Sequence, residues 1–227
     1  MSEIPDELAQ RLRNFFGARV AVHGADATVK AIEALVEAES ARRGEPDPVS
    51  GAFHGLALTQ GSLIKREYDL STHGHWDGWE VGAVIVDVKA LIRVNMEHGF
   101  AAGDAVLRAV ATALGERFPT ARVVRIHPDA FAVLLPPSAE VAVDASLEPS
   151  VREALARRVP ELLAQAKAPE LALDYSVALL HLTIVKPSHW QVLGPLLWAE
   201  CERALTLASR GMTSGLQRRR VELDAAV

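Results

Sequence analysis

Cysteine is almost absent from this sequence, and its absence excludes one class of fold. The 227 residues contain a single cysteine, Cys201, so no disulfide can form within the chain and a disulfide-stabilised scaffold is excluded. The same scarcity indicates a reducing compartment, and we expect a cytoplasmic protein. Cys201 lies in a stretch of helical periodicity, where we expect a small buried residue rather than a nucleophile.

Long apolar runs and an excess of positive charge are also missing. No apolar stretch approaches the roughly 18 residues of a spanning helix, and residues 1–6 contain no apolar signal core, so we expect no membrane insertion. Lys and Arg number 24 against 29 Asp and Glu, a net charge of -5, which argues against nucleic-acid binding. We interpret the short basic cluster Arg218 to Arg220 as a solvated helix or strand end.

The sequence does contain alternating helical and strand patterns. Residues 6–16 and 25–43 have helical spacing, and the breaker cluster at 44–48 follows them. We therefore expect an N-terminal helical segment, residues 1–44, that serves docking or dimerisation. The main domain is expected at residues 45–227.

Within the main domain, the apolar run Val81 to Val86 predicts a strand buried on both faces that ends at Asp87. Two β-rich runs, 122–126 and 131–135, are separated by four residues, which suits a hairpin. Helices are expected at 55–68, at 104–117, at 151–167 with an interruption at Pro160, and from Pro195 to 210; a long strand is expected from Leu171 to Ile184. These elements predict an α/β fold (an α+β sandwich), with one central mixed sheet flanked by helices.

Carboxylates, glycines and an asparagine recur at fixed offsets in this part of the chain. The series Asp87…Asn95…Gly99…Gly103-Asp104…Leu107, followed by Arg125…Asp129…Phe131, resembles the GGDEF domain of diguanylate cyclases. The patterns of that family are D-x-D-x-F-K-x-x-N-D-x-x-G-H-x-x-G-D-x-x-L and R-x-G-G-[DE]-E-F. The resemblance extends over residues 47–212 and starts with a D-P-V-S-G-A motif that is similar to the family's D-x-L-T-G-L.

The resemblance implies specific roles for four residues. Enzymes of this family join two GTP molecules into cyclic di-GMP, each GTP being held on one subunit of a dimer. Asp87 and Asp129 match the two carboxylates that hold Mg²⁺ there, and Asn95 and Asp104 match the pair that reads the guanine edge. From the residues alone, Asp104 is equally well explained as the N-cap of the helix that follows it.

Several departures from the family pattern remove groups that the reaction needs. In the loop His127-Pro128-Asp129-Ala130-Phe131 an imidazole and a proline replace two glycines, and an alanine replaces the glutamate. The imidazole is expected to fill space that the nucleotide requires, and the proline removes an amide donor. Residues that bear on the phosphates and the metal are also replaced, with Lys89 for the second Asp of D-x-D, Ile92 and Ser209 for two lysines, Phe100 for the histidine and His54 for an asparagine of the opening motif.

These departures predict a catalytically inactive signalling or scaffold protein that acts through protein–protein contacts and has no cofactor. A guanine nucleotide remains a candidate ligand through Asn95 and Asp104. The alternative is an active or altered-specificity diguanylate cyclase that uses Mg²⁺ with GTP. Because Lys89 is two residues from Asp87 and could reach the same edge of the sheet, we hypothesise that its ammonium group replaces the metal as the countercharge.

Three further features leave alternatives open. His73, His75 and Asp77 form an H-x-H-x-D half-site for a metal, although an exposed loop explains them as well. Protein partners are expected at the N-terminal helices, which also offer a homodimer contact, or at residues 185–198. This last segment carries Trp190 and Trp198, and its other interpretation is a core cover for the last helix.

Overall fold

The computed structural model describes residues 46–59, 63, 79–135, 143–185, 190–209 and 216–222. The chain divides between Ser40 and Ala41 into two units, and all described residues belong to the second. The N-terminal segment 1–44, with its two predicted helices, and the H-x-H-x-D motif lie outside the described residues. The domain boundary at 44 and 45 therefore stays a prediction.

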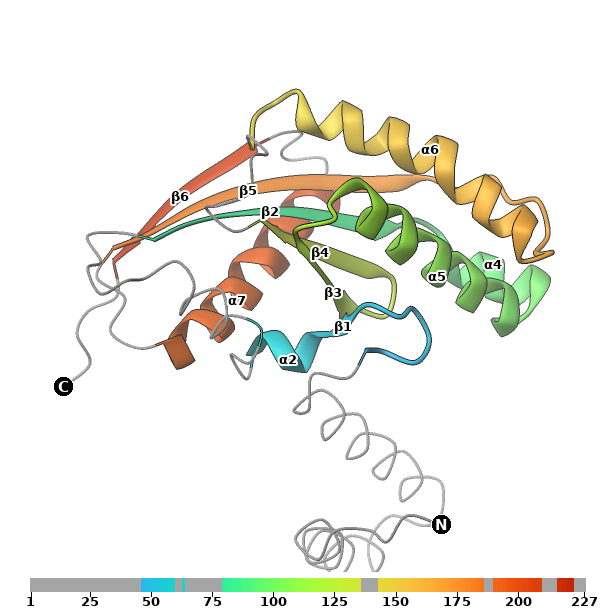
Figure 1. The fold of residues 1–227 in the computed structure, drawn as a ribbon, viewed down its shortest axis with the longest axis horizontal. Coiled ribbons are helices and arrows are strands. Elements are labelled where there is room, and N and C mark those ends of the chain that lie inside the picture. Colours follow the sequence, from blue (N-terminus) through green and yellow to red (C-terminus); the bar gives the residue numbers. More distant parts are fainter. Residues whose placement is uncertain are drawn as a thin grey trace, which may run out of the picture. The chain divides into compact units, whose positions relative to one another are not determined.

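A six-stranded mixed sheet forms the centre of the domain (Figure 1). Its strand order is β1-β3-β4-β2-β5-β6, and the long strand β2 pairs antiparallel with both β4 and β5. The edge strands run parallel to their neighbours, β1 to β3 and β6 to β5. The strands are β1 (Phe53–His54), β2 (Trp79–Val88), β3 (Arg122–His127), β4 (Ala130–Leu135), β5 (Tyr175–Val185) and β6 (Leu216–Glu222).

Helices cover both faces of this sheet (Figure 1). One face packs against α4 (Leu91–His98), α5 (Phe100–Arg117) and α6 (Leu147–Gln165), and the other against α2 (Gly55–Thr59) and α7 (Trp190–Ser209). Successive side chains of β2 enter opposite cores, which explains why its sequence is apolar without alternation. The predicted α/β fold, a mixed sheet flanked by helices, is confirmed.

The segment after β2 differs from the prediction. It contains α4, which the sequence did not reveal, and α5 begins at Phe100 rather than Asp104. Gly99 separates the two helices with φ of 83°, a left-handed value that glycine adopts without strain, and it stands at the C-cap of α4 and the N-cap of α5. Asp104 therefore lies inside a helix, and its interpretation as an N-cap is wrong.

The positions of two prolines in their helices also differ from the prediction. Pro160 lies inside α6 and does not interrupt it, and Pro195 lies inside α7 rather than at its start. Proline in a helix interior costs about 3 kcal/mol, but both helices keep a continuous buried stripe on either side of it. In α6 this stripe is Val151, Leu155, Val159 and Leu163, and in α7 it is Leu193, Leu197, Cys201 and Ala204. Packing of the stripe onto the sheet offsets the local cost.

A substitution at Gly55 tests the packing of α2 against the sheet. A Cβ at Gly55 would lie 2.8 Å from the carbonyl oxygen of Arg125 and would overlap the ring of Trp198. We predict that Gly55→Ala lowers the free energy of unfolding by about 1–3 kcal/mol, because a backbone atom cannot move aside cheaply. Gly115→Ala in α5 is the control, since nothing lies within 4 Å of the added methyl group, and it should stabilise by about 0.5–1 kcal/mol. Urea unfolding of both variants checks this, and equal effects would contradict the packing.

Candidate functional site

The turn of the β3–β4 hairpin is shorter than the sequence suggested. His127 still belongs to β3 and pairs with Ala130 of β4, so Pro128 and Asp129 alone form the turn. The strand register shifts between Arg125 and His127. The hairpin is confirmed, and Phe131, which is fully buried, anchors it in the core on the α5 side.

The guanidinium group of Arg125 holds this turn in place. Its Nη2 donates a hydrogen bond to the carbonyl oxygen of Pro128 (2.6 Å), and its Nη1 forms an ion pair with Asp47 Oδ2 (2.9 Å). Asp47 is only 3% exposed and also accepts hydrogen bonds from the amide (2.8 Å) and the hydroxyl (2.5 Å) of Ser50. Burial by itself raises the pKa of Asp47, but these donors outweigh it and hold the pKa below its ordinary value.

The two predicted metal carboxylates belong to the same end of the sheet. Asp87, at the end of β2, is the cross-strand neighbour of Ala130, and the amide of Val88 donates to the carbonyl oxygen of Asp129 (2.9 Å). The side chain of Asp87 is 14% exposed, and its Oδ2 lies 2.7 Å from Lys89 Nζ. The ion pair that the sequence suggested is therefore present, and the Asp87 carboxylate has a fixed countercharge.

The two residues predicted to read guanine lie beside each other. The amide side chain of Asn95 in α4 packs directly against Gly103 in α5, where a Cβ would overlap its Oδ1, and Gly103 immediately precedes Asp104. The Asn95 Oδ1 atom is buried and, among the described residues, has no hydrogen-bond partner. A buried acceptor without a partner costs about 1–3 kcal/mol, so the Asn95 amide would gain a hydrogen bond by turning toward a ligand that brings an N–H donor.

Exposed apolar side chains replace the expected cations of this region. Ile92, Met96 and Phe100 are 73%, 82% and 78% exposed. They recur at every fourth position along α4 and the start of α5, and we call them the apolar stripe. Ile92 and Phe100 stand at two positions where the resemblance leads one to expect a lysine and a histidine. The side chain of Ser209, at the end of α7, lies outside the described residues.

His127 is engaged with α7. Its Nε2 lies 3.4 Å from Glu202 Oε1, and its ring centroid is 6.1 Å from that of Trp198. The imidazole is thus held on the α7 side of the hairpin. That it also obstructs a nucleotide stays a prediction.

The described part of segment 185–198 contributes mainly to the core. Leu193 and Leu197 are fully buried, as expected of a cover for the sheet, and a partner surface at residues 185–198 stays a prediction. Cys201, one turn further along α7, is fully buried too, and this burial, with the nearby charges of Glu200 and Glu202, raises the pKa of its thiol to about 12. Such a thiol is not a nucleophile, in agreement with the sequence prediction.

Metal-binding clusters are lacking in the part of the chain that the structure describes, where no three His, Cys, Asp or Glu side chains come together. Asp87 and Asp129 alone would need phosphate oxygens and water to complete an octahedral Mg²⁺ shell. With Lys89 bound to Asp87, this donor set does not fit a divalent cation.

The family profile described as "Diguanylate cyclase, GGDEF domain" matches residues 65–183, more than half of the chain. The chain belongs to the GGDEF family. Its domain therefore comes from a family of cyclic di-GMP signalling. Comparison with curated protein sequences finds no match.

Solved GGDEF structures share the fold at low sequence identity. Diguanylate cyclase SiaD from Pseudomonas aeruginosa, in complex with its activator SiaC, is 19% identical with a TM-score of 0.53, over 94% of this chain and 75% of that one. The GGDEF domain of YfiN from the same organism is 19% identical with a TM-score of 0.51, over 78% and 94%. The GGDEF domain of DgcB from Caulobacter crescentus, in complex with c-di-GMP, is 17% identical with a TM-score of 0.52, over 76% and 92%.

A membrane span was not found in this GGDEF domain, since none of the helices that the structure describes is long and apolar enough to cross a bilayer.

The pKa of Asp47 gives a pH-dependent prediction for this GGDEF domain. Because its folded-state pKa is depressed, Asp47 stabilises the fold above the ordinary aspartate pKa of about 3.9, and this contribution is lost as the pH falls through the lower folded-state value. We predict that Asp47→Asn lowers the free energy of unfolding by about 3 kcal/mol at pH 7 and weakens its decline below about pH 4. Denaturant unfolding at pH 7 and pH 3 measures this. Glu153→Gln, on the exposed face of α6, should change neither value, and an unaltered acid decline in Asp47→Asn would contradict the account.

Proposed function

We propose that this GGDEF protein is catalytically inactive and acts as a signalling or scaffold protein through protein contacts, binding a guanine nucleotide without converting it. The observation that carries the proposal is the ion pair between Lys89 and Asp87, with Ala130 as the neighbouring residue on the next strand. The charge arrangement there is the reverse of what a cyclase needs.

A diguanylate cyclase activates a 3′-hydroxyl and neutralises a triphosphate with Mg²⁺, which requires negative charge at the protein's metal site. Cross-strand neighbours have Cβ atoms about 4.5–5.5 Å apart, so a glutamate at position 130 would place a second carboxylate next to Asp87. Ala130 supplies no carboxylate at this position. Lys89 adds a positive charge 2.7 Å from an Asp87 carboxylate oxygen, so the charges of these two residues cancel and less negative charge is available to a divalent cation.

The phosphate side has lost its donors as well. Ile92 offers no charge and is largely exposed, and Pro128 has no amide hydrogen to donate. The loss of one transition-state donor typically lowers the rate by about a hundredfold to a thousandfold. Several such losses are not additive, but together they leave little activity.

The base-reading side keeps both polar groups. Asn95 presents a buried acceptor without a partner, and the neighbouring Asp104 accepts N–H groups. A guanine edge carries N–H donors and a carbonyl acceptor, which suits an amide together with a carboxylate. This asymmetry, with base contacts present and phosphate contacts absent, favours binding over turnover.

Protein contact is supported by the apolar stripe. Three large apolar side chains with exposures above 70% on adjoining helices are the composition of an interaction surface rather than of a phosphate site. SiaD was solved with its activator SiaC bound, which gives a precedent for a protein partner on a GGDEF protein. The N-terminal segment 1–44 is a second candidate contact, including one between two copies of the chain.

Calorimetric titration with GTP and with cyclic di-GMP, with and without Mg²⁺, tests the proposal together with a turnover assay. We predict GTP binding with little dependence on Mg²⁺ and no cyclic di-GMP formation. Product formation would overturn the inactive assignment in favour of an active cyclase. Absence of GTP binding would leave scaffolding and refute nucleotide binding.

Gly103→Ala is the variant that ties binding to the proposed base site. The added methyl group occupies the place of the Asn95 amide, which must move away, whereas alanine itself favours the helix by about 1 kcal/mol over glycine. GTP binding should therefore weaken about tenfold or more while the stability stays equal or rises. Gly115→Ala in the same helix is the control for the helix effect. Equal GTP affinity in both variants would contradict the site.

The variant Lys89→Asp tests whether the Lys89 ammonium group replaces a metal ion as the countercharge of Asp87. The variant removes the ammonium group, restores the family's second aspartate and leaves Asp87 available, so Mg²⁺ affinity should rise. Arg157→Asp, the same charge change on the exposed face of α6, serves as the control and should not change Mg²⁺ binding. No gain in Mg²⁺ affinity in Lys89→Asp would refute the replacement of metal by lysine.

A further inference from the structure

The face of the sheet that packs against α6 carries polar side chains at one end. Two rows of residues cross the strands β2, β5 and β6 there, one formed by Gly82, His181 and Arg218 and the other by Glu80, Thr183 and Arg220. Side chains alternate between the two faces of a strand. Since Leu179 of β5 and Leu216 of β6 contact the α6-side core, His181, Thr183, Arg218 and Arg220 project from that same face.

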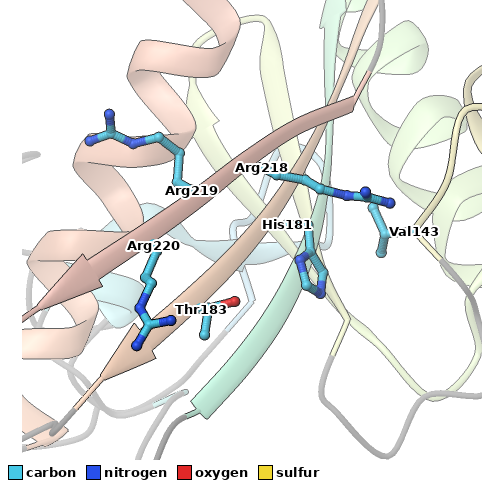
Figure 2. A pocket seen from close by; sticks show the side chains of 6 residues that line it. All are labelled: Val143, His181, Thr183, Arg218, Arg219 and Arg220. Atoms are coloured by element: carbon cyan, nitrogen blue, oxygen red, sulfur yellow. The ribbon is translucent and has the colours of Figure 1, made fainter.

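A groove of about 490 Å³ lies over these residues (Figure 2). Val143, which precedes α6, forms one wall of it. Val143 can settle onto the sheet because Gly82 has no side chain: a Cβ at Gly82 would lie 2.5 Å from Val143 Cγ2. The volume falls within the range of about 300–1,000 Å³ that is typical of small-molecule sites.

The charge of the groove is positive and largely unbalanced. Arg218 and Arg220 are both exposed, and within the part of the chain that the structure describes neither forms an ion pair. Glu80 is the acidic neighbour on this face, and its Oε2 lies 3.7 Å from His181 Nε2. Two guanidinium groups on one face of one strand repel each other, so a bound anion would stabilise them.

Arg219, the middle residue of the basic cluster Arg218 to Arg220, makes a different contact. It projects from the opposite face of β6, where its Nη2 lies 3.0 Å from Glu200 Oε1 of α7. Arg219 also borders the groove, but Figure 2 shows its side chain directed away from that of Arg218, which extends past His181 toward Val143. The buried Glu200 thus explains Arg219 as a structural residue, and no comparable contact explains the other two.

We propose that this groove binds a phosphate group of a small molecule, with Arg218, Arg220, His181 and Thr183 as its ligands. A guanidinium donates two parallel hydrogen bonds to phosphate oxygens, and the Thr183 hydroxyl and the His181 ring add single donors. None of the described residues that line the groove is Phe, Tyr or Trp, so we expect it to recognise the phosphate and not the base of a nucleotide. It is separate from the Asn95 and Asp104 region, which follows the other end of β2.

Calorimetric titration of the full chain with pyrophosphate at low ionic strength tests this site. The double variant Arg218→Gln/Arg220→Gln should weaken pyrophosphate binding about tenfold or more. Arg157→Gln/Lys167→Gln removes the same charge from exposed positions of α6 and the turn after it, and it should leave the affinity unchanged. Thr183→Val should weaken binding by a smaller factor.

A comparison of ATP with pyrophosphate identifies the ligand class. ATP should bind an Asp104→Ala chain as pyrophosphate does, because a nucleotide without guanine still carries the phosphates. Binding of pyrophosphate but not ATP would restrict the site to inorganic phosphates, which still supports it.

Other outcomes would overturn the proposal. No pyrophosphate binding by the unaltered chain, or an equal loss in the α6 control, would refute a specific site. Because β6 is an edge strand and charged residues protect such edges from pairing, a double variant that self-associates on size-exclusion chromatography with unchanged pyrophosphate affinity would assign the arginines to edge protection instead.

Discussion

The guanidinium of Arg125 joins two parts of the chain that are far apart in sequence, the turn at Asp47 and the tip of the β3–β4 hairpin. Asp47 is buried and holds Arg125 with the help of Ser50, and Arg125 in turn holds the carbonyl oxygen of Pro128. The position of Asp129 therefore depends on a charge buried below it. The backbone of Asp129 is further tied to Val88 at the end of β2. Through these contacts the signature loop keeps its place although most of its signature side chains differ.

These contacts are compatible with the proposal that the site has lost its chemistry while its fold persists. Arg125, Asp47 and the buried Phe131 maintain the hairpin, and none of them is a reacting group. Lys89, Ile92 and Ala130 stand where groups that handle metal or phosphate are expected, and Lys89 and Ile92 lie outside the hydrophobic core. The residues that hold the loop in place thus differ from those at the positions of reacting groups. Substitutions can therefore remove the reacting groups without unfolding the loop.

The sequence predicted the features that depend on local pattern. Val81 to Val86 is apolar at every position but one, Gly82, because the strand faces two cores. The ion pair of Lys89 with Asp87 was predicted from their separation of two residues at the end of this strand. Helix α4 escaped prediction because it is only eight residues long and buries only Leu91 and Val94, which is too short an apolar pattern to recognise. The predicted helix interruption at Pro160 and helix start at Pro195 were wrong because tertiary packing offsets the local cost of a proline inside a helix. Asp47 and Arg125 are separated by 78 positions, and the basic groove needs the pairing of β5 with β6; neither can be read from spacing alone.

The central claim is that base recognition remains in this domain while the metal and phosphate contacts are lost. A crystal structure of the chain grown with Mg²⁺ and a non-hydrolysable GTP analogue tests it most directly. The account predicts guanine density between Asn95 and Asp104, with Lys89 still bound to Asp87 and no metal on that carboxylate. A Mg²⁺ ion that bridges Asp87 and the triphosphate, with Lys89 displaced, would contradict it.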